Sequence, residues 1–130
     1  MTNIRGVIKI LEIAYYSRTG NVRDFVSWYM KDFKSFNIEE QEATGKCVLI
    51  TPTYSFGEVP EEVEEWLEHN ANKVVAVVSS GNKNWGNRFG RAGLKISNRL
   101  EVPLLMRFEL KGSQEIADSL KEKILEIGEC

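Results

Sequence analysis

The residues best suited to bind a ligand follow the first apolar segment of the chain. The run Ser17-Arg18-Thr19-Gly20-Asn21-Val22 joins that segment directly to a predicted helix. Its hydroxyls, asparagine and glycine lie among the backbone N–H groups that a helix leaves unpaired in its first turn. Such a loop suits a phosphate monoester, which carries about −1.5 to −2 charges near neutral pH. The alternative interpretation of this segment is an ordinary turn with a helix cap. A Walker A loop is excluded, because no Gly-Lys-Ser/Thr follows.

Two later loops contain side chains that could hold a flat ring. The segment 51–60 combines hydroxyls and a glycine with Tyr54 and Phe56, and the segment 79–90 has three asparagines, three glycines and Trp85. Asparagine both donates and accepts hydrogen bonds, and glycine allows close approach of the backbone. With the phosphate loop, these features fit flavin mononucleotide (FMN). The alternatives are that Tyr54 and Phe56 only cover the sheet edge and that Trp85 packs on the core.

All the predicted cofactor contacts fall in these three loops, and no metal ligand or catalytic side chain is predicted, because the chemistry would take place on FMN. The expected contacts are Ser17, Arg18, Thr19, Gly20, Asn21, Val22, Pro52, Thr53, Tyr54, Ser55, Phe56, Gly57, Ser80, Gly81, Asn82, Asn84, Trp85, Gly86, Phe89 and Gly90.

The elements that must position these loops alternate between short apolar runs and amphipathic stretches. Strands are predicted at 7–15, weakly at 36–40, and at 47–50, 74–78 and 104–110; helices begin near Val22, Pro60, Phe89 and Ser113. Apolar residues at Val22 and then every third or fourth position to Phe33 indicate one buried helical stripe. Trp28 and Trp66 fall on the predicted helices and are expected to be packing residues rather than ligand contacts. Buried strands joined by helices predict an α/β fold, a flavodoxin-like three-layer sandwich with a five-stranded parallel sheet of order 2-1-3-4-5.

Composition excludes several other classes of protein. With 130 residues and 42% hydrophobic residues, the chain is expected to form one FMN-binding domain over residues 1–130. A net charge of −2 argues against nucleic-acid binding, and no apolar run would span a membrane. Cys47 and Cys130 form no Cys-x-x-Cys pair, His69 is the single histidine, and a cytoplasmic location is expected. A phospho-accepting receiver domain is excluded, because Ala14-Tyr15-Tyr16 and Ile50-Thr51 offer no carboxylate at the strand ends.

Several segments resemble one family closely. Ser17 to Asn21 matches the phosphate loop of flavodoxins, whereas Thr51 to Pro60, Ser80 to Gly90 and Arg107 to Ser113 resemble a narrower group, the NrdI family of flavodoxin-like partners of class Ib ribonucleotide reductase. The resemblance covers nearly the whole chain from Ile13 onward. Members often carry glycine where this chain has Ser55, so a redox-coupled peptide flip is in question there.

The resemblance implies a redox activator rather than a conventional turnover enzyme. Its FMN, reduced by a flavodoxin- or thioredoxin-type reductase, would react with dioxygen to supply a superoxide- or peroxide-level oxidant. That oxidant would assemble the dimanganese-tyrosyl radical cofactor of the class Ib ribonucleotide reductase small subunit. The alternatives are a general flavodoxin electron carrier and a binding module that has lost its flavin.

The distribution of charged residues along the chain bears on the reduction of the flavin, independently of the family resemblance. Between His69 and Leu100 the chain has six basic residues and no Asp or Glu, whereas Glu58 to Glu68 contains six glutamates and no Lys or Arg. We expect Lys83 and Arg88 to favour an anionic reduced flavin, because an opposite charge at about 6 Å contributes roughly 1–3 kcal/mol at intermediate dielectric. The same basic segment could dock an acidic partner.

Overall fold

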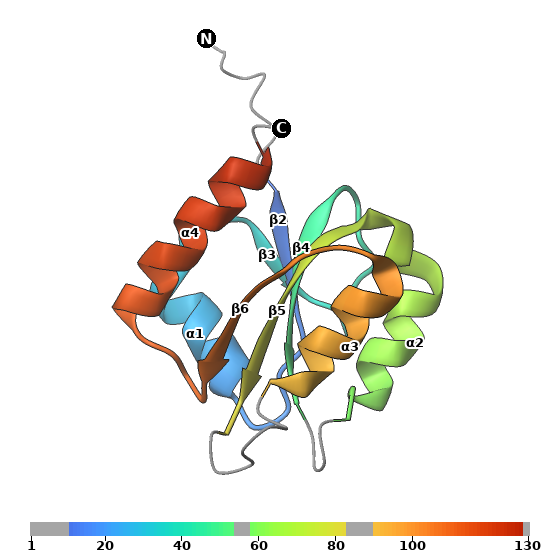
Figure 1. Cartoon of the computed structure of the whole chain (residues 1–130), viewed down its shortest axis with the longest axis horizontal. Coiled ribbons are helices and arrows are strands. Elements are labelled where there is room, and N and C mark those ends of the chain that lie inside the picture. Colours follow the sequence, from blue (N-terminus) through green and yellow to red (C-terminus); the bar gives the residue numbers. More distant parts are fainter. Residues whose placement is uncertain (1–10, 54–57, 83–89, 129–130) are drawn as a thin grey trace, which may run out of the picture.

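The computed structural model describes residues 11–53, 58–82 and 90–128, which form a five-stranded sheet flanked by helices (Figure 1). The strands are β2 (Glu12–Tyr15), β3 (Ser35–Asn37), β4 (Cys47–Pro52), β5 (Val74–Gly81) and β6 (Leu104–Glu109). Every neighbouring pair is parallel, in the order β3-β2-β4-β5-β6. Counted along the described chain this is 2-1-3-4-5, so the predicted topology is confirmed.

Four α-helices of the described residues complete three layers. They are α1 (Asn21–Tyr29), α2 (Glu61–Asn70), α3 (Arg91–Leu100) and α4 (Gln114–Gly128), with a short 3₁₀ helix, η1 (Ala71–Lys73), after α2. Figure 1 shows α1 and α4 on one face of the sheet and α2 and α3 on the other. The Ser113 hydroxyl accepts a hydrogen bond from the Ile116 N–H at 3.2 Å, which confirms Ser113 as the cap of α4.

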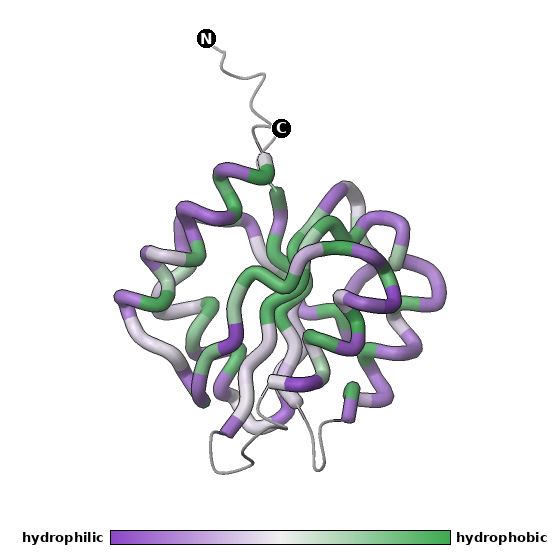
Figure 2. The backbone as a smooth tube through the Cα atoms, in the orientation of Figure 1, coloured by the Kyte–Doolittle hydropathy of each residue, from purple (hydrophilic) through white to green (hydrophobic). Residues whose placement is uncertain are grey.

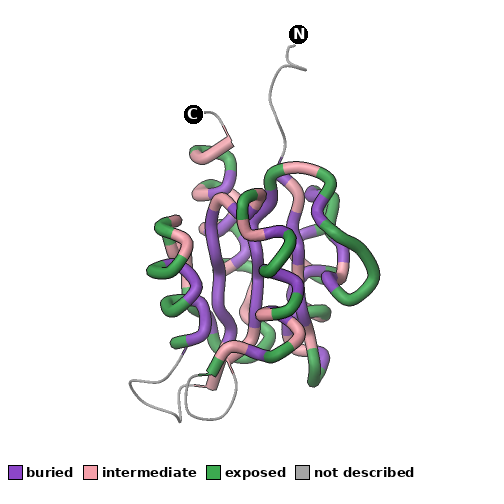
Figure 3. Tube along the Cα trace, turned by 90° about the vertical axis from the view of Figure 1, so that its right-hand side faces the viewer, coloured by how far each residue is buried: buried purple, intermediate pink, exposed green. Residues whose placement is uncertain are grey.

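The strand register sorts the core residues between the two faces. Ala14, Leu49 and Val77 are paired across β2, β4 and β5, and all three pack with α2 and α3. Their chain neighbours point to the opposite face, where they pack with α1 and α4. Figure 2 shows the hydrophobic strands at the centre of the molecule, and Figure 3 shows buried strands between helices that carry both buried and exposed residues. This two-sided burial explains why β4 and β5 contain continuous apolar runs.

The predicted stripe of α1 is buried, but one expectation about this helix is wrong. Val22, Phe25 and Val26 are at most 4% exposed, whereas Trp28, expected to be a packing residue, is 51% exposed. Trp28 lies off the three-and-four spacing of the stripe, so the helix turns it to the surface. There the Lys111 ammonium lies 5.1 Å from the centre of its ring. Trp66, the other helical tryptophan expected to pack, is buried.

Two strand boundaries also differ from prediction. The predicted loop 79–90 begins too early, because Ser79, Ser80 and Gly81 belong to β5, and β4 likewise continues to Pro52. Buried serines fit inside a strand here because other segments supply partners for their hydroxyls. The first strand is described from Glu12, and the earlier part of its predicted range lies outside the described residues. Among the described helices, none has the length and apolar character needed to cross a bilayer.

Candidate functional site

A cavity of about 140 Å³ lies at the carboxyl edge of the sheet, where the strand order reverses between β2 and β4. It is lined by residues from four separate segments, namely Ser17, Arg18, Thr19, Asn21, Val22, Pro52, Thr53, Ser80, Gly81, Asn82 and Leu110. All of these except Leu110 were predicted contacts. A volume of this size accommodates a phosphate group and adjoining atoms rather than a whole three-ring nucleotide, for which pockets of about 300 Å³ or more are usual.

The first segment has the geometry of an anion site. Gly20 precedes α1 with φ +98°, a left-handed conformation that favours glycine, and no side chain of the described residues caps the helix there. The first-turn N–H groups therefore remain available to a ligand. The Ser17 hydroxyl oxygen is buried and has no hydrogen-bond partner within the described part of the chain. A buried hydroxyl without a partner is costly, and a phosphate oxygen would satisfy it.

Local charges around the start of α1 offset one unfavourable carboxylate. Asp24 lies in the first turn, where its negative charge would oppose an anion. The Lys111 Nζ approaches an Asp24 carboxylate oxygen to 2.8 Å, and the Arg23 Nη2 approaches to 3.3 Å. The hydrogen bond from Lys111 is the main cause that lowers the pKa of Asp24. Two cationic side chains thus lie beside one carboxylate, and the net charge of these three side chains is positive.

The second and third segments are joined by a hydroxyl network that holds the start of α3. The Thr53 and Ser79 hydroxyl oxygens lie 3.1 Å apart. Thr53 Oγ1 accepts a hydrogen bond from the Ala92 N–H at 3.2 Å, and Ser79 Oγ accepts one from the Gly93 N–H at 3.1 Å. Thr53, predicted to contact the cofactor, therefore lines the cavity while its hydroxyl positions α3.

The fourth segment was not predicted to be part of the site. The Ser80 hydroxyl donates a hydrogen bond to the Leu110 carbonyl at 2.8 Å, and the Leu110 N–H donates to the Gly81 carbonyl at 2.9 Å. Leu110 follows the last strand, within the segment 107–113 already singled out for its resemblance. Because Leu110 lies at the end of β6, next to β5 in the sheet, the predicted strand order could have identified it as a residue of the site.

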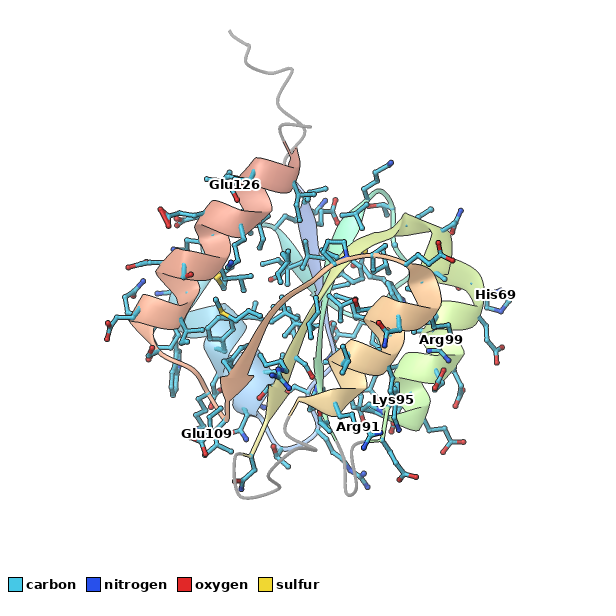
Figure 4. All side chains as sticks on the ribbon, viewed as in Figure 1. His69, Arg91, Lys95, Arg99, Glu109 and Glu126 are labelled. Atoms are coloured by element: carbon cyan, nitrogen blue, oxygen red, sulfur yellow. The ribbon has the colours of Figure 1, made fainter. Side chains whose placement is uncertain are left out.

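A larger hollow of about 600 Å³ lies beside this cavity but suits an anion poorly. Besides Arg18, Val59 and Lys95, it is lined by the glutamates Glu58, Glu61, Glu62 and Glu64. Four carboxylates would repel a phosphate. Arg99, on α3 with Arg91 and Lys95 (Figure 4), pairs with Glu64 at 3.0 Å. We therefore assign the ligand site to the smaller cavity.

The described residues contain only part of the predicted ring-binding surface. Tyr54, Ser55, Phe56, Gly57, Asn84, Trp85, Gly86 and Phe89 lie outside them, as do Lys83 and Arg88. Gly20 and Gly90 do not line the cavity; they precede α1 and α3, both with positive φ. A Cβ at Gly90 would approach the Arg107 side chain to 2.7 Å. Contact of these residues with FMN stays a prediction.

Comparison with known proteins places this geometry in a family. The family described as "NrdI Flavodoxin like" matches residues 13–122. Protein NrdI of Macrococcus caseolyticus (strain JCSC5402) is 38% identical over 118 residues, covering 90% of this chain and 91% of that protein. A Streptococcus pneumonia TIGR4 flavodoxin structure is similar at 22% identity and TM-score 0.66, covering 91% and 96% of the two chains. An FMN-bound Fusobacterium nucleatum flavodoxin has 18% identity, TM-score 0.59 and coverage of 92% and 96%.

Proposed function

The chain belongs to the NrdI flavodoxin-like family, and we propose that it is an FMN-containing redox accessory protein of class Ib ribonucleotide reductase. In this proposal, residues 1–130 act as one FMN-binding domain in the cytoplasm. The observation that carries the FMN part is the cavity at the carboxyl edge, where three predicted loops meet beside the uncapped start of α1. The family membership supports the reductase part.

The residues present fit the phosphate end of FMN. The buried Ser17 hydroxyl and the N–H groups at the start of α1 would hold the phosphate, with Thr19 and Asn21 beside it. Val22 is 1% exposed, so its contribution would come from its backbone. The flavin ring would be held by Thr53 through Gly57 and Gly81 through Gly86, as the family resemblance implies. Each group assigned to the phosphate is neutral and can donate a hydrogen bond, which suits a doubly charged monoester.

Bound FMN would supply one- and two-electron redox chemistry, including transfer of electrons to dioxygen. The protein around it would bind the nucleotide, take electrons from a flavodoxin- or thioredoxin-type reductase, and deliver a superoxide- or peroxide-level oxidant to the partner. That partner is proposed to be the dimanganese small subunit of class Ib ribonucleotide reductase. The oxidant would there support assembly of the dimanganese-tyrosyl radical cofactor.

The direct test mixes the reduced FMN-loaded protein, dioxygen and a manganese-loaded small subunit of the same organism. We expect a tyrosyl radical signal by electron paramagnetic resonance that depends on both FMN and manganese. Protein without FMN and subunit without manganese are the matched controls. No radical, together with a strongly stabilised one-electron semiquinone in a redox titration, would instead support a general electron carrier.

A further inference from the structure

The turn that follows β6 contains a leucine in an unusual backbone conformation. The Gly112 N–H donates a hydrogen bond to the Glu109 carbonyl at 2.9 Å, which closes a four-residue turn. Leu110 is the first central residue of this turn and has φ +52°. Turns with positive φ at that position favour glycine, because a side chain there is crowded against the backbone. Figure 4 labels Glu109, where this turn leaves the sheet.

The other non-glycine residue with positive φ among the described residues has an ordinary explanation. Glu101, with φ +59°, follows the last residue of α3, where helices commonly end in a left-handed residue. Leu110 follows a strand and ends no helix. Backbone strain of this kind is commonly found at functional sites, which makes it a starting point for a hypothesis of function.

Contacts on both sides fix the turn in this strained form. The Ser80 hydroxyl and the Gly81 carbonyl hold the Leu110 carbonyl and N–H, at 2.8 and 2.9 Å. Next along the chain, Lys111 pairs with Asp24 of α1 at 2.8 Å. A Cβ at Gly112 would come within 2.8 Å of the Phe25 ring, so the turn lies close against α1. The conformation of Leu110 is therefore set by its neighbours rather than by its own preference.

We propose that Leu110 is a contact residue of the flavin site, forming an apolar wall for the part of FMN next to its phosphate. Leu110 lines the same cavity as Thr19 and Asn21, and it is 43% exposed. A ligand in the cavity would cover this apolar side chain. This inference rests on the proposed binding of FMN and adds a residue from the turn after the last strand to the three loops.

The test compares Leu110→Gly with Glu101→Gly in the full chain. Both substitutions place glycine at a positive φ, so both apoproteins should melt within a few degrees of the parent. Glu101 lies at the far end of α3 from the cavity, and Glu101→Gly should leave the Kd of FMN unchanged. Leu110→Gly should raise that Kd roughly three- to tenfold, because it removes a half-exposed leucine that the ligand would cover.

Outcomes of this experiment separate the two proposals. If the parent binds FMN and Leu110→Gly binds it equally tightly, the role of Leu110 is refuted and FMN binding stands. If the parent apoprotein binds no FMN, both proposals fail. Should Leu110→Gly melt far below the parent, Leu110→Asn replaces it, because asparagine also tolerates this conformation. An unchanged Kd in that variant would overturn the inference, and a raised Kd would support it.

Discussion

Replacing Thr53 with valine should loosen the start of α3 without changing the shape of the side chain. The substitution exchanges a hydroxyl for a methyl group and so removes the acceptor of the Ala92 N–H at 3.2 Å. It also removes the contact with the Ser79 hydroxyl at 3.1 Å. Ala92 is fully buried, so its N–H would lose its partner in a place that water reaches poorly.

The expected cost follows from these two lost contacts. An unsatisfied buried donor costs about 1–3 kcal/mol, and loss of a helix cap costs about 1 kcal/mol. Thr53 is only half-buried, so water can replace part of the loss. We therefore expect Thr53→Val to lower the free energy of unfolding by about 1.5 kcal/mol, which corresponds to a fall in Tm of roughly 5 °C for a chain of this length.

Urea unfolding of the apoprotein, followed by circular dichroism, measures this change. Thr53→Ser is the matched control, because it keeps the hydroxyl and loses one methyl group, and it should cost less than about 1 kcal/mol. A double-mutant cycle with Ser79→Ala should show coupling of roughly 0.5 kcal/mol or more, since the two side chains share one network. Equal stability of Thr53→Val and the parent would refute the reasoning about α3.

Two further predictions concern the buried thiol and the basic segment. In a Cys130→Ser variant, folded protein should react with a thiol reagent far more slowly than unfolded protein, because burial raises the pKa of Cys47 to about 12. Because the pKa of Cys47 is raised in the folded state, the neutral thiol's contribution to the free energy of unfolding is complete below the ordinary thiol pKa of 9.0 and is lost as pH rises toward about 12. Equal reactivity of folded and unfolded protein would contradict the burial of this thiol. Lys83→Gln and Arg88→Gln should each lower the reduction midpoints of bound FMN in a redox titration, whereas unchanged midpoints would remove the charge argument.

Sequence patterns predicted a parallel sheet because strands buried on both faces are continuous apolar runs, and the order 2-1-3-4-5 was expected because five such strands fit a flavodoxin-like fold. The continuous apolar run from Val74 to Val78 needs cover on both faces of the sheet, and β5, which contains it, lies inside the sheet between β4 and β6. The same reasoning ended that strand too early. Ser79 and Ser80 are read as loop residues from their polarity, and only partners far along the chain, such as Thr53 and Leu110, show why they can be buried.

Within the site, local motifs were more informative than single side chains. The phosphate loop was recognisable because its glycine and hydroxyls are adjacent in sequence and directly precede a helix. Leu110 could not be found in this way, since neither its left-handed conformation nor its place in the cavity is encoded by its immediate neighbours. Trp28 could have been placed correctly, because the spacing of the α1 stripe already excludes it from the core.

The central claim is that the start of α1 binds the phosphate of FMN, and the ratio of two dissociation constants tests it directly. Titration of the apoprotein with FMN and with riboflavin, which lacks the phosphate, can be followed by quenching of flavin fluorescence. We expect FMN to bind about 100-fold more tightly, and Ser17→Ala to weaken FMN about tenfold while leaving riboflavin unchanged. Equal affinity for the two flavins would contradict the account.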